Sequence, residues 1–184
     1  RRFLSSKEYG YTKIQIEEAI RQTKEMARLS DSKRGILADT NNKLYEVLTT
    51  HIAIQPDAEH HHENVYLFDF NNPLANNFAI AEEVSYIDEL TGKHSRPDLV
   101  VYVNGIALCV IELKRSTVSL EEGIKQNLSN EIDLIPSFFT TTQFTVAASD
   151  KNGFRYATIL TPQKFWCPWK RDDHKVGVSL TDKE

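Results

Sequence analysis

The sequence has little cysteine and no long run of apolar residues. Its two cysteines, Cys109 and Cys167, form neither a disulfide framework nor a zinc-binding pattern, so we expect a reducing, cytoplasmic setting. The longest apolar stretch, residues 99–111, is interrupted by Asn104-Gly105 and falls short of the roughly 20 residues that cross a membrane. No basic segment followed by an apolar one opens the chain, so nothing predicts secretion.

An excess of positive charge is also missing. The 184 residues include 22 Lys and Arg against 26 Asp and Glu, which gives a formal net charge of −4. This balance excludes a protein that coats nucleic acid by charge alone, but it is compatible with a nuclease, whose active site is itself acidic. With 40% apolar residues, the chain can bury the core of a domain of ordinary size.

The order of apolar and polar residues predicts an α/β domain around a mixed sheet. Apolar residues recur at helical spacing over 12–29, 40–52 and 119–133, and Thr12 with Gln15 fits a capping box at the start of the first helix. Runs typical of strands occupy 65–70, 78–86, 99–103, 106–113, 143–148 and 154–159. We expect an N-terminal helical region (1–52), a core (53–160) and a C-terminal tail or linker (161–184).

The strongest local signal is a hairpin with charged residues at one end. Asn104-Gly105 separates two apolar runs, and both residues accept the positive φ of a type I′ turn. A two-residue turn pairs position 98 with a position near 111, so Asp98 is predicted to lie beside Glu112. Side chains alternate along a strand, so Glu112 and Lys114 share a face. The same parity places two apolar residues on this face, Leu108 and Val110.

Two carboxylates and an ammonium group at one sheet edge suit metal-dependent hydrolysis of a phosphodiester. Carboxylate oxygens are ligands for Mg²⁺, which lowers the pKa of a bound water and clamps a phosphate oxygen. Lys114 could orient or deprotonate the attacking water, or stabilise charge on the phosphate. The alternative is a structural salt bridge at the strand end, between Lys114 and either Glu112 or Asp98.

Pro97-Asp98 with Glu112-Leu113-Lys114 matches the PD-(D/E)xK nuclease signature. The surrounding sequence resembles the N-terminal endonuclease domain of the R (restriction, or motor) subunit of type I restriction–modification enzymes. Matching segments cover most of the chain from about Leu44 onward and include 67–73, 76–78, 96–106, 110–114, 122–128, 138–147, 153–159 and 162–164. The resemblance implies a restriction-endonuclease-like fold, a mixed β-sheet flanked by helices, in which 53–160 form the PD-(D/E)xK nuclease core.

The resemblance also implies roles for individual residues. Asp98 and Glu112 would be Mg²⁺ ligands, with the carbonyl of Leu113 as a third ligand. Lys114 would be the catalytic lysine.

Helical residues enter the implied site as well. Many family members have a glutamine and a tyrosine four residues apart on the next helix. Gln126 fits the glutamine, as a phosphate or site contact, whereas Asn130 stands at the tyrosine position. Related nucleases also use an upstream helical glutamate near the metal. Glu46 is a candidate for it, although Glu46 alone is typical of a solvated helix residue.

R subunits cleave double-stranded DNA within a complex that translocates DNA with ATP and includes methylase and specificity subunits. The resemblance therefore implies a Mg²⁺-dependent type I restriction endonuclease domain, with 161–184 leading toward helicase-like motor domains. Thr91-Gly92-Lys93-His94 lacks the first glycine and the Ser/Thr of a phosphate loop. ATP is thus expected to bind the motor domains and not this chain.

Other interpretations stay open. The chain could be a free-standing PD-(D/E)xK repair nuclease, or a non-catalytic scaffold that keeps the charged hairpin edge as structure. His60-His61-His62 lies in a polar loop and matches no zinc spacing, so we interpret it as solvated. Five basic residues near the site could contact DNA phosphates or be ordinary solvated charges: Lys93, Arg96, Lys114, Arg115 and Lys125.

Overall fold

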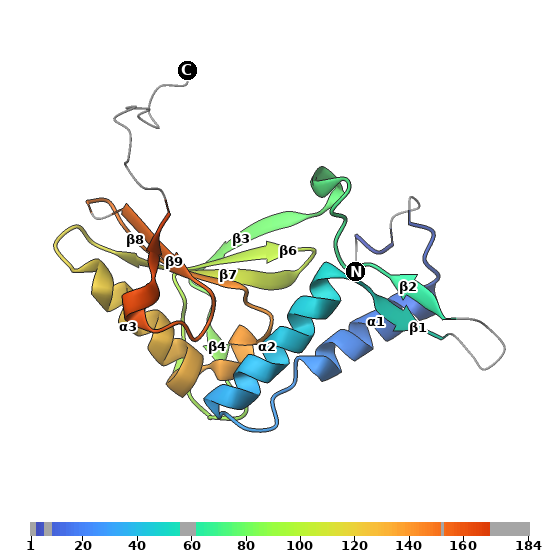
Figure 1. Ribbon diagram of the computed structural model, residues 1–184, viewed down its shortest axis with the longest axis horizontal. Helices are drawn as coiled ribbons and strands as arrows, with labels where there is room; N and C mark the ends of the chain where they lie inside the picture. Colours follow the sequence, from blue (N-terminus) through green and yellow to red (C-terminus); the bar gives the residue numbers. More distant parts are fainter. Residues whose placement is uncertain (1–2, 6–8, 56–61, 152, 170–184) are drawn as a thin grey trace, which may run out of the picture.

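The Asn104-Gly105 turn joins the two strands that position the candidate site. Both residues have positive φ, 53° and 84°, as the sequence predicted for a type I′ turn. They connect β6 (Leu99–Val103) to β7 (Ile106–Lys114). The computed structural model describes residues 3–5, 9–55, 62–151 and 153–169, and these two strands lie in its six-stranded sheet (Figure 1).

The sheet is mixed, as predicted. Its order is β10-β9-β8-β7-β6-β3, and each neighbouring pair is antiparallel except β7 with β8. A parallel pair needs a crossover connection, which here contains α3 (Leu120–Ser129). The remaining strands of this sheet are β3 (Phe78–Glu82), β8 (Phe144–Ser149), β9 (Gly153–Ala157) and β10 (Cys167–Pro168). Because β10 pairs with β9, the sheet continues past residue 160.

A β-bulge in β7 interrupts the alternation of side chains between the two faces of the strand. The pairing with β6 shifts by one residue at Leu108, which has no partner on that strand. The prediction that Leu108 shares a face with Val110 is therefore wrong, because Leu108 packs on the cluster around α1 while Val110 is buried in the cluster beneath α2. The same shift pairs Leu99 with Ile111, which sets position 98 level with Glu112.

Two hydrophobic clusters join the N-terminal helices to the sheet. α1 (Lys13–Met26) begins after Thr12, and the predicted capping box with Gln15 is present. It packs with the strand pair β1 (Ile52–Ile54) and β2 (Glu63–Val65) around the first cluster. α2 (Arg34–Thr49) contributes Leu48 to this cluster and Leu37 to the second one. Figure 1 shows α2 lying between α1 and α3.

Two loop segments are held by hydrogen bonds between side chains and the backbone. The predicted strand 65–70 ends at Val65, since Asp69 and Asn76 bond to each other through one backbone N–H and one carbonyl, at 2.9 and 2.8 Å. Residues 88–93 connect the paired strands β4 (Tyr86–Ile87) and β5 (His94–Ser95). Asp88 between them is fully buried and accepts a bond from the backbone N–H of Ser137 at 2.8 Å.

Short turns complete the described elements. They are the 3₁₀ segments η1 (Pro73–Ala75), η3 (Pro136–Thr140) and η4 (Gln163–Phe165), and the π-helical turn η2 (Asn130–Leu134). His60 and His61 of the predicted histidine loop, and 170–184 of the predicted tail, lie outside the described residues. Within the described part of the chain, none of the helices combines the length and apolarity needed to cross a membrane.

Replacing Asn41 with alanine should destabilise the fold. Asn41 is buried on α2, and its amide nitrogen donates to the carbonyls of Phe139, Thr140 and Thr142 at 3.4, 2.9 and 2.8 Å. Its loss leaves buried carbonyls without a donor, at a cost of about 1–3 kcal/mol. Urea unfolding of Asn41→Ala should show this loss, whereas Asn42→Ala at the neighbouring exposed position should change stability by less than about 0.5 kcal/mol. Equal urea midpoints for the two variants would contradict the expectation.

Candidate functional site

Asp98 stands at the entrance to β6 and is fixed by both neighbouring strands. The residue before it, Pro97, is buried, and Asp98 itself is half-buried. Its backbone carbonyl accepts a bond from the N–H of Glu83 at 2.8 Å, just past the end of β3. Its carboxylate accepts a bond from the backbone N–H of Leu113 on β7 at 2.7 Å. The acid is therefore held at the same end of the hairpin as Glu112 and Lys114.

Glu112 is a carboxyl group buried between β7 and α3. Its exposed fraction is 0%, and Asn130 donates to its Oε1 from 3.1 Å. Its Oε2 is buried and receives no hydrogen bond from the described residues. Burial, with the adjacent carboxylate of Asp98, raises the pKa of Glu112 to about 8, although Lys114 and Asn130 oppose the shift. The two acids are thus close enough for a proton or a cation to lie between them.

Lys114 passes over the surface of α3 at a glycine. A Cβ at Gly123 would come within 3.2 Å of Cγ of Lys114 and 3.1 Å of Cβ of Ala147, so the missing side chain lets α3 lie close to β7 and β8. The ammonium group of Lys114 donates to Oε1 of Gln126. The structure thus brings together the lysine and the helical glutamine that the sequence singled out.

Asn130 contacts the predicted acid, and the sequence pattern gave it no role. It is fully buried where α3 passes into η2, one helical turn beyond Gln126. Besides donating to Glu112, it accepts a bond from the hydroxyl of Ser95 at 2.7 Å. The signal that could have identified it is the spacing of four residues from Gln126, which places both side chains on one side of a helix.

Another buried acid lies apart from Asp98 and Glu112. Glu131 is fully buried, and burial raises its pKa to about 7. Its Oε2 accepts a bond from the backbone N–H of Leu160 at 2.6 Å, and the carbonyl of Leu160 accepts one from Arg34. Since Leu160 has a positive φ of 60°, Glu131 and Arg34 together hold a turn that few side chains adopt. This acid has a structural role.

Other residues named from the sequence lie outside the charged cluster, by which we mean Asp98, Glu112 and Lys114. Glu46 is exposed on α2, which packs against η3 and not against the strand ends. The basic residues near the site have local partners: Arg96 pairs with Glu83 at 3.3 Å, and Lys125 with Glu122 at 2.9 Å. In the described ranges, no three His, Cys, Asp or Glu side chains converge as a metal-binding group. A cation at this site would need backbone or solvent ligands besides Asp98 and Glu112.

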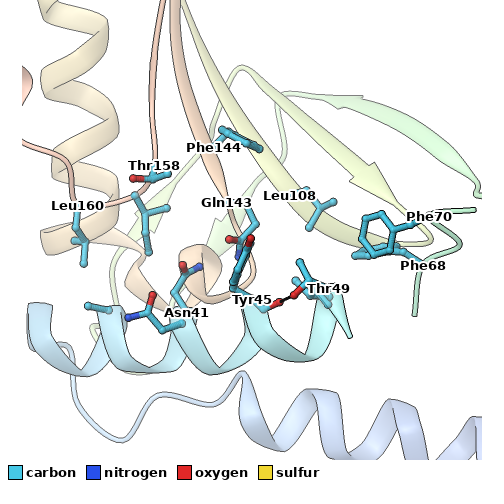
Figure 2. Close-up of a pocket in the computed structure, with 14 residues that line it drawn as sticks. Asn41, Tyr45, Thr49, Phe68, Phe70, Leu108, Gln143, Phe144, Thr158 and Leu160 are labelled. Carbon is cyan, nitrogen blue, oxygen red and sulfur yellow. Dashed lines mark hydrogen bonds between the residues drawn. The ribbon is translucent and has the colours of Figure 1, made fainter. Parts of the chain in front are cut away.

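The charged cluster does not line either of two cavities in the described structure. One, of about 620 Å³, is bounded by α2 and the sheet, and Figure 2 shows Asn41 and Tyr45 on the helix opposite Leu108 and Phe144 on the strands. A second, of about 700 Å³, lies near α1 and the Asn104-Gly105 turn. Neither is lined by Asp98, Glu112 or Lys114. The cluster is instead at a strand end, where the side chain of Leu113 is 48% exposed.

Comparison with known proteins relates this geometry to a family. A relative in Methanocaldococcus jannaschii, named "Putative type I restriction enzyme MjaIXP endonuclease subunit", is 31% identical over 110 residues. The alignment covers 56% of this chain but 10% of the relative, so the chain spans a small part of that protein's length. The family model for the type I restriction enzyme R protein N terminus matches residues 5–165, which include the hydrophobic cluster beneath α2 as well as Asp98, Glu112 and Lys114. The chain belongs to the family of type I restriction enzyme R protein N-termini.

Proposed function

We propose that this chain is the Mg²⁺-dependent endonuclease domain of a type I restriction R subunit, with a restriction-endonuclease-like fold. Its reaction would be hydrolysis of phosphodiester bonds in double-stranded DNA. The observation that supports this most strongly is the buried carboxyl of Glu112 beside Asp98, with Oε2 lacking a hydrogen-bond donor among the described residues. An acid in this position is costly to ionise without a cation.

The donor set fits a hard divalent cation. Asp98 and Glu112 supply carboxylate oxygens, which Mg²⁺ prefers. The N–H of Leu113 points toward Asp98, and the carbonyl of a strand residue points to the same side as its N–H, so Leu113 can offer a third oxygen. When bound, Mg²⁺ would polarise a water molecule and offset negative charge on a phosphate.

Lys114 is the candidate for proton handling and charge stabilisation. Its charge acts on Glu112 and lowers the pKa of that acid, so the ammonium group lies near the carboxylate pair. Its bond to Gln126 fixes the long side chain and leaves two of its three N–H groups for a water or a phosphate oxygen. Gln126 therefore orients the lysine in this proposal.

Partners follow from the family in the same way. We propose that DNA is the substrate, that methylase and specificity subunits and C-terminal helicase-like motor domains complete the enzyme, and that ATP is used by those motor domains. A cytoplasmic setting is part of the proposal, supported by the two cysteines, Cys109 and Cys167, which are both free.

Removing either acid should weaken binding of a divalent cation. Titration calorimetry of Mn²⁺ into the chain should show one site or two in the wild type and a loss of at least about tenfold in affinity for Asp98→Ala and Glu112→Gln. Glu82→Gln is the matched control, because Glu82 is an exposed carboxylate at the same end of the neighbouring strand β3. Unchanged Mn²⁺ affinity in both acid variants would contradict a metal site at this position.

The affinity for Mn²⁺ should rise with pH up to about 8. Glu112 has a pKa raised to about 8, so below that pH a proton must leave before the carboxylate can act as a ligand. One competing proton weakens binding by about tenfold for each pH unit below the pKa. Titrations at pH 6, 7 and 8 in two buffers of different ionisation enthalpy would report both the affinity and the proton released. Equal affinity at pH 6 and pH 8 would exclude Glu112 as the proton-competing ligand.

Replacing Lys114 should separate DNA cleavage from DNA translocation. In the assembled restriction enzyme, Lys114→Ala should reduce DNA cleavage by about 100-fold or more while ATP-driven translocation continues, because the lysine acts on the reacting groups. Lys125→Ala is the control, since Lys125 pairs with Glu122 on the exposed side of α3. Full cleavage by Lys114→Ala would favour the scaffold interpretation.

A further inference from the structure

Asn130 lies between Glu112 and a strand pair that is remote in sequence. Its amide nitrogen donates to Oε1 of Glu112 at 3.1 Å, and its amide oxygen accepts from the hydroxyl of Ser95 at 2.7 Å. Asn130 is fully buried, so both bonds form away from water. Ser95 belongs to β5, and β5 pairs with β4 outside the main sheet.

The β4–β5 unit is anchored to the segment that contains Asn130. Thr91 donates from its hydroxyl to the carbonyl of Leu134 at 2.6 Å, and Lys93 donates to the carbonyl of Asp133 at 3.0 Å. Asp88 accepts from the backbone N–H of Ser137 at 2.8 Å. These contacts hold β4–β5 against η2 and η3, so Ser95 has a defined position relative to Asn130.

The backbone at Asn130 has a geometry that suits a specific contact. Its carbonyl accepts from the N–H of Ile135 at 2.9 Å, which closes a π-helical turn immediately after α3. Such turns insert an extra residue into a helix and redirect the side chains around it. The turn coincides with the residue that meets the buried acid.

The carboxylate of Glu112 determines which end of the amide faces it, and the serine hydroxyl binds the other end. An asparagine side chain has a donor end and an acceptor end of nearly equal shape. The reverse orientation would place Oδ1 of Asn130 against the carboxylate of Glu112, two acceptors in contact. In the observed orientation an N–H points at Glu112, and the hydroxyl of Ser95 donates to Oδ1 and so holds the far end of the amide.

We propose that Asn130 is a positioning residue for Glu112 and that Ser95 anchors its amide by a bond to Oδ1. The inference rests on the proposed function, because the orientation of Glu112 matters if its free Oε2 is a metal ligand. Its consequence is that the β4–β5 unit sets the position of the proposed ligand Glu112, although the unit contributes no ligand itself.

The first test needs no metal. In the ¹⁵N-labelled 184-residue chain, the side-chain amide resonances of Asn130 should shift in both Glu112→Gln and Ser95→Ala. Ser85→Ala is the matched control, because the hydroxyl of Ser85 contacts His94 at 2.9 Å and not Asn130. If the Asn130 resonances respond to neither Glu112→Gln nor Ser95→Ala, the proposal is wrong.

The second test measures Mn²⁺ affinity. Asn130→Ala should weaken binding by about tenfold or more, the usual effect of removing a group that orients a ligand. Ser95→Ala should cause a smaller loss that disappears in the Asn130→Ala background, since the serine acts through the asparagine. Asn127→Ala controls for loss of a buried asparagine, because Asn127 bonds to the carbonyl of Val146 at 2.9 Å and not to Glu112.

The outcomes separate this inference from the proposed function. Suppose that the Asn130 resonances shift in both Glu112→Gln and Ser95→Ala, but the wild type binds no Mn²⁺. This result would overturn the metal site and support the hydrogen bonds that link Ser95, Asn130 and Glu112. Mn²⁺ binding that Asn130→Ala and Ser95→Ala leave unchanged would overturn the positioning role. If Asn130→Ala fails to fold, Ser95→Ala, at a half-buried position, still gives the result.

Discussion

Burial of the Glu112 carboxyl is the constraint around which the described structure is arranged. A carboxylate taken out of water must be paired, hydrogen-bonded or protonated. Here one strand brings Asp98 beside it, the next helix supplies an amide donor, and a lysine two residues along the same strand offsets part of the negative charge. Each of these groups comes from a different part of the hairpin–helix unit, so the local environment of Glu112 depends on the packing of α3 against β7.

Much of this arrangement follows from short-range rules. The Asn-Gly turn, the alternation along β7 and the helical spacing of α3 are properties of neighbouring residues, and they are enough to predict Asp98, Glu112 and Lys114 at one end of the hairpin. The capping box at Thr12 is equally local. Gln126 follows from the family resemblance, and its contact with Lys114 agrees with a position in the site.

What sequence reasoning missed depends on contacts distant in the chain. α2 begins at Arg34, earlier than the apolar pattern indicated, and its first turn places Leu37 in the cluster beneath the helix. The burial of Asn41, a polar residue, depends on carbonyls about 100 positions away. The bulge at Leu108 reverses which residues of β7 face the cluster beneath α2, so that Ala107 and Val110 both contact it, and alternation alone does not predict this. The contact of Asn130 with Ser95 could not be predicted without knowing that β5 lies beside η2.

Gly123 has no functional group, yet it sets the distance between the helix and the two strands beneath it. A glycine inside a helix is about 1 kcal/mol less favourable than alanine, and the chain tolerates this at the point of closest approach. Selection for a working site would therefore act on side-chain volume at position 123 as firmly as on charge at position 112. A sequence in this family that retained both acids and the lysine but had a bulky residue at this position would keep the signature of a nuclease while losing the spacing between its strand and its helix.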